Sequence, residues 1–77
     1  PLDIRLSFSS RWESYLKRHR WHASQSDPTP RADGRLEVGF RLCVTHDLVH
    51  WIRGHGKDLI VISPDSLREL VESGRDP

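Results

Sequence analysis

Two segments of the chain alternate strictly between apolar and polar residues, a spacing that predicts strands with one buried and one exposed face. The first covers residues 2–8, and the second, which is the clearer of the two, covers residues 35–44. A short β-branched run at 59–62 predicts a further strand that its neighbours pack closely. The alternation indicates a sheet that other elements cover on one side only.

Residues 21–32 combine positions that permit a strand with positions that interrupt one. Pro28 and Pro30 exclude a regular central strand, so we interpret this segment as an irregular edge strand. Asp33-Gly34 follows directly and predicts a type I′ hairpin turn, in which both central residues take positive φ. The edge strand is therefore expected to lead into the next strand through a tight turn.

Two helices are marked by capping residues and by apolar residues at helical spacing. Ser10 is the expected N-cap of the first, and Glu13 three residues later completes a capping box. Thr45 is the expected N-cap of the second, which Gly54 and Gly56 end. The inward face of the first helix is predicted to hold Trp12, Tyr15, Leu16 and His19.

A third helix follows the last strand, with Ser63 as N-cap, Pro64 at the first helical position and Gly74 at its end. The order strand, helix, strand, strand, helix, strand, helix predicts an α+β fold of the ferredoxin-like βαββαβ type. Such a fold has an antiparallel sheet with helices on one face, here with an added C-terminal helix. Residues 1–74 form a single domain in this prediction, and residues 75–77 form a tail.

Composition favours one small folded domain. The 77 residues carry a net charge of +1, one cysteine and no methionine, and at this length the core is small. One cysteine cannot form an internal disulfide, so a reducing compartment, the cytoplasm, is expected. No apolar run approaches the roughly 18 residues of a membrane span, so no membrane partner is expected. Proline at position 1 and the lack of methionine lead us to expect a piece of a longer protein.

Metal binding and catalysis both receive little support from the sequence. The chain places Cys43, His46, His50 and His55 within thirteen residues, and the spacing of the middle pair puts two imidazoles on one helix face. Zinc sites usually bring a second short-spaced Cys or His pair from another element, and the other histidines, His19 and His22, are expected to lie across the fold, so we predict no metal and no cofactor. His46 and Asp47 are adjacent on a helix and cannot orient each other, and no nucleophile or phosphate-loop motif occurs. The chain is therefore not expected to be an enzyme.

Residues 17–22 form a basic stretch that contains an aromatic residue, and this pattern raises the possibility of nucleic-acid binding. Its candidate residues are Arg18, Arg20 and Trp21. The predicted outward sheet positions offer no aromatic residue for base stacking, unlike an RNA-recognition module. A solvated helix end that carries cations explains the same stretch, because cations are favourable near helix C-termini.

The polar positions of the alternating strands form a second candidate surface. Three arginines, Arg5, Arg35 and Arg41, are predicted to lie on this face together with Asp3, Glu37 and Gly39. Cross-strand charge pairs would support one another there, as on any exposed sheet. The alternative is a surface for a partner domain or an anionic ligand, and the glycine leaves room for close approach. Both interpretations remain open at this point.

Several short motifs stand in a fixed order along almost the whole chain. Most specific are Trp21-His22-x-Ser24-Gln25 and Ser63-Pro64-x-x-Leu67-Arg68; the others are Leu2-x-Ile4-x-Leu6-x-Phe8, Tyr15-Leu16, Asp33-Gly34, Phe40-Arg41-Leu42, His50-Trp51-Ile52 with Gly56, and Val61-Ile62. Together they resemble the C-terminal extension, called the WCX domain, of WYL-domain bacterial transcriptional regulators.

The resemblance implies a regulator with an N-terminal helix-turn-helix domain that binds DNA, a central WYL sensor and this ferredoxin-like domain at its C-terminus. In such proteins the extension serves homodimer assembly and borders the effector-sensing cleft, with anionic, oligonucleotide-type ligands for some members. The leading hypothesis is therefore a regulatory and dimerisation domain without catalysis. A stand-alone nucleic-acid-binding module and a small-molecule-binding regulatory domain of an enzyme are the alternatives.

Overall fold

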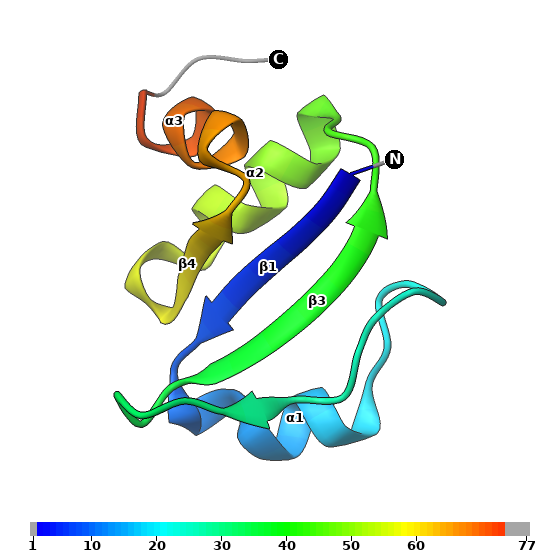
Figure 1. Ribbon diagram of the computed structural model, residues 1–77, viewed down its shortest axis with the longest axis vertical. Helices are drawn as coiled ribbons and strands as arrows, with labels where there is room; N and C mark the ends of the chain where they lie inside the picture. Colours follow the sequence, from blue (N-terminus) through cyan, green and yellow to red (C-terminus); the bar gives the residue numbers. More distant parts are fainter. Residues whose placement is uncertain (1, 74–77) are drawn as a thin grey trace.

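Four strands and three α-helices make up the computed structural model, which describes residues 2–73 (Figure 1). The strands are β1 (Leu2–Phe8), β2 (Thr29–Pro30), β3 (Leu36–Leu42) and β4 (Leu59–Ser63), and the helices are α1 (Glu13–Arg18), α2 (His46–Gly54) and α3 (Asp65–Ser73). Short 3-10 turns at Ser10–Trp12 and Gly56–Asp58 precede α1 and β4. The predicted α+β class is confirmed. The helix end predicted at Gly74 and the tail at 75–77 lie outside the described residues.

The strands form one antiparallel sheet in the order β2-β3-β1-β4. The long strands β1 and β3 lie at its centre and pair over their whole length, from Leu2 opposite Leu42 to Phe8 opposite Leu36. β4 pairs with the other side of β1. This order is compatible with a ferredoxin-like fold, and it places the first and third strands centrally as predicted.

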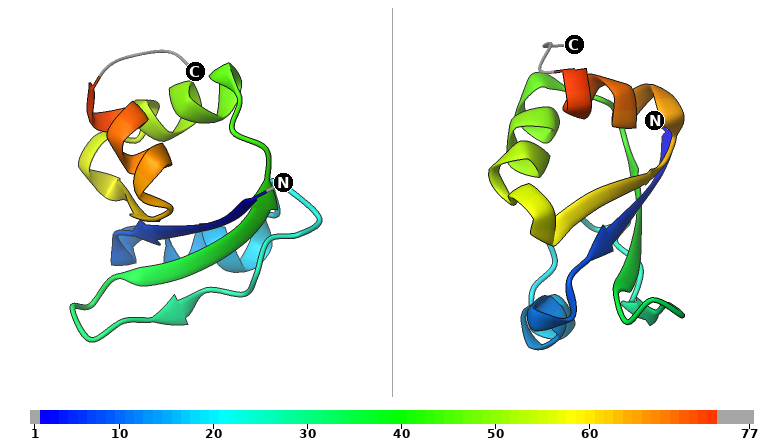
Figure 2. Two further views of the ribbon diagram at one scale, coloured as in Figure 1. Left: turned by 45° about the horizontal axis from the view of Figure 1, so that its top comes forward. Right: turned by 90° about the vertical axis from the view of Figure 1, so that its left-hand side faces the viewer.

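Alternate residues of the central strands point to one side of the sheet and form the core. On β1, Ile4, Leu6 and Phe8 are at most 1% exposed. Helices α1 and α2 lie on this same side, and α3 lies across one end of the sheet (Figure 2). The remaining core residues are Leu16, Leu36, Val38, Phe40, Val49, Ile52, Leu59, Val61 and Leu67. Among residues 2–73, no helix covers the other side of β1 and β3.

The two predicted N-caps differ in outcome. The Thr45 hydroxyl accepts a hydrogen bond from the Leu48 N–H at 3.1 Å, which confirms this cap of α2. The capping box predicted between Ser10 and Glu13 is wrong. A tight 3-10 turn begins there instead, and its first backbone hydrogen bond runs from the Trp12 N–H to the Ser9 carbonyl at 3.0 Å. The α-helix starts only after this turn, so Ser10 is not its capping position.

The start of α3 also lies one residue later than predicted. Ser63 is the last residue of β4, and the Pro64 carbonyl accepts hydrogen bonds from the N–H groups of Leu67 and Arg68 at 3.1 and 3.2 Å. An N-cap residue is the one whose carbonyl accepts the first intrahelical bond. Pro64, and not Ser63, therefore occupies the N-cap of α3.

The side chain of Arg53 connects α2 to the end of α3. Its guanidinium donates to the carbonyls of Leu70 at 2.7 Å and Val71 at 3.3 Å. These carbonyls belong to the last turn of α3 as the structure describes it, and carbonyls near a helix end are commonly satisfied by side chains. A cation in this place also complements the negative end of the helix dipole.

The hairpin between β2 and β3 has a different turn from the predicted one. Gly34 has φ +84°. Among the described residues only glycines take positive φ, so Asp33 does not, and the type I′ prediction is wrong. The Arg31 N–H donates to the Arg35 carbonyl at 2.8 Å and closes a three-residue loop. A loop of this length needs only one left-handed residue, which the glycine supplies. The Arg35 N–H, 2.9 Å from Asp33 Oδ1, holds the pKa of Asp33 below its ordinary value.

Only Thr29–Pro30 of the predicted edge strand is a strand. At 24–26 the chain runs beside β3 but binds it largely through serine side chains. Ser24 Oγ accepts from the Arg41 N–H at 2.9 Å, and Ser26 Oγ accepts from the Gly39 N–H at 2.8 Å. The Ser26 N–H donates in turn to the Gly39 carbonyl at 2.8 Å. The edge position was predicted correctly, but the strand is shorter than predicted. At 24–26 serine hydroxyls, and not backbone carbonyls, accept the hydrogen bonds from β3, so no regular strand forms there.

Candidate functional site

The outward side of the two central strands carries polar residues and no helix. These residues are Asp3, Arg5 and Ser7 on β1 and Glu37, Gly39 and Arg41 on β3, in register with one another. Two of the three predicted arginines, Arg5 and Arg41, have side chains that are 60% and 63% exposed. The structure therefore brings these two to one accessible face, which we call the outer face.

Charges on the outer face are paired across the strands. Arg5 Nη1 lies 2.7 Å from Glu37 Oε2, and Arg31 Nη1 lies 2.8 Å from Glu37 Oε1. Arg41 Nη1 lies 3.1 Å from Asp3 Oδ1. Exposed ion pairs of this kind contribute about 0 to 1 kcal/mol each. A partner or an anionic ligand can therefore displace a carboxylate from Arg5 or Arg41 at small cost.

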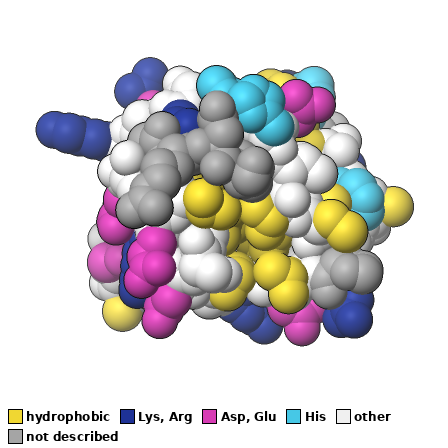
Figure 3. All heavy atoms as spheres, turned by 90° about the horizontal axis from the view of Figure 1, so that it is seen from above, with side chains coloured by type: hydrophobic (Ala, Val, Ile, Leu, Met, Phe, Trp, Pro, Cys, Tyr) yellow, Lys and Arg dark blue, Asp and Glu magenta, His cyan; other side chains and the backbone are white. Residues whose placement is uncertain are grey.

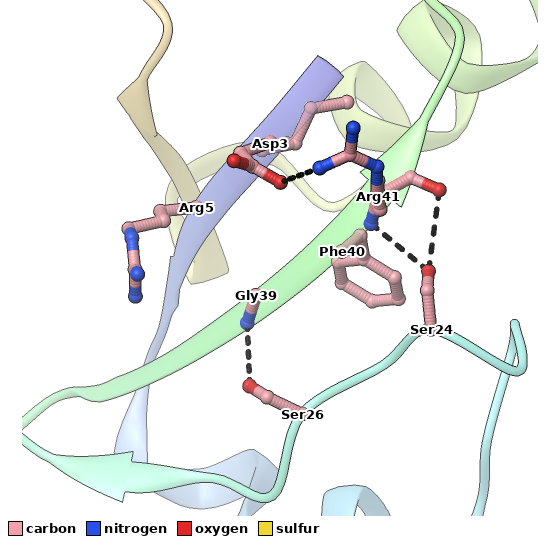
Figure 4. A pocket seen from close by; sticks show the side chains of 8 residues that line it. Asp3, Arg5, Ser24, Ser26, Gly39, Phe40 and Arg41 are labelled. Atoms are coloured by element: carbon pink, nitrogen blue, oxygen red, sulfur yellow. Dashed lines mark hydrogen bonds and ion pairs between the residues drawn. The ribbon is translucent and has the colours of Figure 1, made fainter. Parts of the chain in front are cut away.

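A hollow of about 240 Å³ lies between these two arginines (Figure 4). Its lining residues are Asp3, Ile4, Arg5, Ser24, Ser26, Gly39, Phe40 and Arg41. The guanidinium groups of Arg5 and Arg41 point away from each other, so they do not form a single clamp for one anion (Figure 4). A Cβ at Gly39 would lie 3.5 Å from Ser26 Oγ, an ordinary contact. Packing inside the chain does not require this glycine, and its missing side chain keeps the hollow open.

The third predicted arginine, Arg35, has a different environment. Its guanidinium donates to the hydroxyl and carbonyl of Ser7 at 2.6 and 2.8 Å, and to the carbonyls of Asp58 and Lys57 at 3.1 and 3.4 Å. These groups belong to the end of β1 and to the turn before β4. The side chain thus joins three segments at one end of the sheet, and its Nε and Nη2 donors are already engaged.

The basic stretch is also largely engaged within the chain. The Arg20 guanidinium donates to the Gln25 carbonyl and to Asp27 Oδ1, the latter at 2.9 Å. Arg18 Nε donates to the Ser14 carbonyl of the same helix at 3.3 Å. The predicted patch therefore does not present both arginines freely to a nucleic acid.

A buried glutamine organises the loop after α1. Gln25 is 4% exposed; its side-chain oxygen accepts from the Trp21 N–H at 2.8 Å, and its amide donates to the His19 carbonyl at 3.2 Å. Sequence reasoning quoted this residue only as part of a motif and assigned it no role. A buried amide needs hydrogen-bond partners, and Gln25 finds them in the backbone of Trp21 and His19. Its place in the motif Trp21-His22-x-Ser24-Gln25 was the one sequence signal that pointed to this residue.

Trp21 belongs to the aromatic part of the core. Its ring stacks on Phe8 with centroids 5.7 Å apart and contacts Trp51 edge-on at 4.9 Å. His55, for which we predicted no role, packs against Trp51 at 5.0 Å and Trp12 at 5.1 Å. Helical spacing indicated the inward side of Trp51, whereas the contact between this tryptophan and Trp21 joins segments thirty residues apart.

The histidines and the cysteine do not gather into one site. His46 and His50 lie side by side on α2 with ring centroids 4.2 Å apart, while His55 packs in the aromatic cluster and Cys43 is exposed. Within residues 2–73 no three potential ligands from His, Cys, Asp and Glu are placed to hold a metal ion. No helix in that same range is both long and apolar enough to cross a membrane.

A second surface is apolar. Viewed from above, hydrophobic side chains gather beside α3, with acidic side chains along the α3 side (Figure 3). On α3, Leu70 lines a hollow of about 290 Å³ with Ser66, Glu69 and Ser73. On β1, Leu2 is an exposed apolar residue at 46%. Contiguous exposed apolar surface is typical of protein contact sites.

Comparison with known proteins gives one result. The family model described as the WCX domain matches residues 1–74, which is nearly the whole chain. No curated protein matches the sequence.

Proposed function

The chain belongs to the WCX domain family, whose members are small regulatory domains, and from this membership we propose its function. It acts as the C-terminal regulatory and dimerisation domain of a WYL-type helix-turn-helix transcriptional regulator in the bacterial cytoplasm. DNA is bound by the N-terminal domain of that regulator. The present domain borders the effector-sensing cleft and carries out no catalysis.

The outer face is the observation that carries this proposal. It is polar and without a covering helix, and Arg5 and Arg41 hold their exposed guanidinium groups at either side of the hollow above Gly39. A WYL sensor domain packed here would place an anionic or oligonucleotide effector within reach of either arginine. Arg35 is not included, because its donors are engaged with backbone carbonyls.

In this mechanism the effector changes the arrangement of the domains. It binds better to the arrangement in which Arg5 or Arg41 leaves its own carboxylate and meets the effector or the sensor. A ligand shifts such an equilibrium only by its difference in affinity for the two states. The weak ion pairs with Glu37 and Asp3 keep that exchange inexpensive.

The test is a regulator that carries both Arg5→Ala and Arg41→Ala. We expect it to keep its fold and to lose effector affinity, measured by calorimetry, by about tenfold or more, since a charge-assisted contact contributes roughly 1.5 to 3 kcal/mol. Arg68→Ala is the matched control, because Arg68 pairs with Asp65 on α3, away from the outer face. Unchanged effector affinity in the double variant contradicts the role of this face.

The apolar surface beside α3 supports the dimerisation part of the proposal (Figure 3). Leu70→Asp introduces a charge at a partly exposed apolar position of α3, where this residue lines the hollow with Ser66, Glu69 and Ser73. We expect this variant of the regulator to dissociate at higher protein concentration than the wild type in analytical ultracentrifugation. Equal dissociation of the two proteins contradicts dimerisation through this surface.

The nucleic-acid-binding alternative receives less support from the geometry, because Trp21 stacks on Phe8 and contacts Trp51, and Arg20 also donates to the backbone carbonyl of Gln25. Titration of the chain with a labelled single-stranded oligonucleotide at two salt concentrations separates the two functions. A nucleic-acid module binds with a steep salt dependence. The proposed regulatory domain is expected to bind weakly at both salt concentrations.

A further inference from the structure

A second hollow, of about 230 Å³, opens between the loop after α1 and the first turns of α2. Its lining residues are Trp21, His22, Phe40, Leu42, Asp47, Leu48 and Trp51. Five of the seven are apolar and three are aromatic. We call this hollow the aromatic pocket; it lies on the helix side of β3 and is separate from the hollow above Gly39.

The rings of the aromatic pocket meet at steep angles. Trp21 and Trp51 are inclined by 67° with centroids 4.9 Å apart, and Phe40 and Trp51 by 79° at 6.4 Å. Rings set at such angles present their faces in different directions. Cations are attracted to the faces of aromatic rings, most strongly to tryptophan.

A carboxylate lies at the wall of this pocket without a partner of its own. Asp47 is exposed in the first turn of α2 and forms no hydrogen bond or ion pair with residues 2–73. His22, on the opposite element, uses Nδ1 for the Ser24 hydroxyl and N–H, at 2.7 and 3.1 Å. Asp47 is therefore the one lining residue with a fixed negative charge, and it stands beside three aromatic rings.

The size of the aromatic pocket limits its occupant. Sites for drug-sized ligands measure about 300 to 1,000 Å³, and this pocket is smaller than that. A single long side chain fits the volume better than a complete metabolite. We propose that the aromatic pocket receives an arginine side chain presented by a protein partner.

The chemistry of the pocket selects arginine among side chains. Its methylene stem can pack on apolar surface such as Leu42 and Leu48, and its planar guanidinium can stack on the face of one tryptophan ring, Trp21 or Trp51, which are inclined to each other by 67°. The same group donates to a carboxylate, here Asp47. A neutral apolar side chain would use the rings and leave this carboxylate unused.

The test uses the 77-residue chain and two capped tripeptides, Gly-Arg-Gly and Gly-citrulline-Gly, which have the same shape and differ in charge. Binding is followed by NMR through the indole N–H signals. We expect the arginine peptide to move the signals of Trp21 and Trp51, and to leave that of Trp12, which does not line the pocket. The citrulline peptide is expected to bind about fivefold more weakly.

Two variants locate the charge that is responsible. Asp47→Asn is expected to weaken the arginine peptide about fivefold and to leave citrulline binding unchanged. Asp65→Asn is the control, because Asp65 also lies in the first turn of a helix, α3, and does not line the pocket, so it should change neither affinity.

Three outcomes overturn the proposal. The first is an unchanged Trp21 and Trp51 signal, and the second is equal affinity for the two peptides. The third is binding of free L-arginine more than tenfold tighter than the capped peptide, which identifies a free amino acid as the occupant. None of these results bears on the effector test of Arg5 and Arg41, so the two proposals succeed or fail separately.

Discussion

The two sides of the central strand pair differ in almost every physical respect, although they are built from alternate residues of the same strands. Ile4, Leu6 and Phe8 point into the core and are essentially unexposed. Arg5 lies between them in sequence and keeps 60% of its side chain in solvent, paired only with Glu37. Stability therefore comes mainly from one side, and the other side is free to serve a partner. Substitutions should separate these two roles cleanly.

Phe8→Ala is expected to have the largest effect on stability. This ring is fully buried and contacts the rings of Trp21, Trp51 and His55. Removing a buried phenylalanine costs about 3 to 5 kcal/mol, a large part of what a small domain possesses. Urea denaturation followed by circular dichroism measures the loss. Phe8→Leu retains most of the volume and should lose far less, whereas equal losses in both variants would point to a specific need for the ring.

Arg35→Ala tests whether every outward arginine is dispensable. Its hydrogen bonds to Ser7, Lys57 and Asp58 join the ends of two strands. We expect a loss of about 2 kcal/mol in the free energy of unfolding, because hydrogen bonds from a charged group exceed those between neutral groups. Arg35→Lys keeps the charge and loses the planar fork, so it should recover only part of the stability. A stability equal to that of Arg41→Ala would mean that the two arginines have the same role.

Asp58 contributes a smaller effect that appears only in acid. The Ser9 hydroxyl donates to Asp58 Oδ1 at 2.9 Å and, with the charge of Arg11, holds the pKa of Asp58 below its ordinary value of 3.8. Because the pKa of Asp58 is lower in the folded protein, its carboxylate stabilises the fold above pH 3.8. This contribution is lost as the pH falls through the lowered pKa. Asp58→Asn should therefore weaken the fall in stability below about pH 4, measured by urea denaturation at several pH values. Ser9→Ala should change the acid profile in the same direction, and a profile unchanged in both variants contradicts this cause.

The double variant Arg5→Ala, Arg41→Ala should show the smallest change in stability. Both pairs are exposed and contribute about 0 to 1 kcal/mol each. Single surface substitutions rarely change the free energy of unfolding by more than about 0.5 kcal/mol, so we expect the double variant to lose less than about 1 kcal/mol. Thermal denaturation of both proteins measures the difference. A loss comparable to that of Arg35→Ala would remove the distinction between the two sides of the sheet.

The alternating strands were predictable because burial on one face imposes a period of two residues, and Leu2–Phe8 and Leu36–Leu42 follow it. The Thr45 cap was predictable for a similar local reason. The hairpin turn was not, because Asp33-Gly34 suits more than one loop length and Arg31 and Arg35 close the longer one.

The surfaces were less accessible to sequence reasoning, since long side chains reach beyond the face on which they begin. Arg35 has the position of an outward residue, yet its guanidinium reaches carbonyls 22 to 28 residues away in the sequence. Trp21 stands in a basic stretch, and its burial depends on Phe8 and Trp51, which no local pattern links to it. Asp47 likewise lines one pocket with Trp21 and Phe40, which lie far from it in the sequence, so no local pattern predicts that they meet.

The serine contacts along β3 also bear on how the protein avoids self-association. β2 pairs with β3 only at Glu37 and Leu36, so the backbone N–H groups of Gly39 and Arg41 would otherwise form an open strand edge, the usual starting point for aggregation. Ser26 and Ser24 occupy those two donors. Replacing both serines by alanine would cost little packing, yet it would expose a strand edge beside an apolar core. We therefore expect the variant without these two serines to precipitate on storage before any decrease in its melting temperature is measurable.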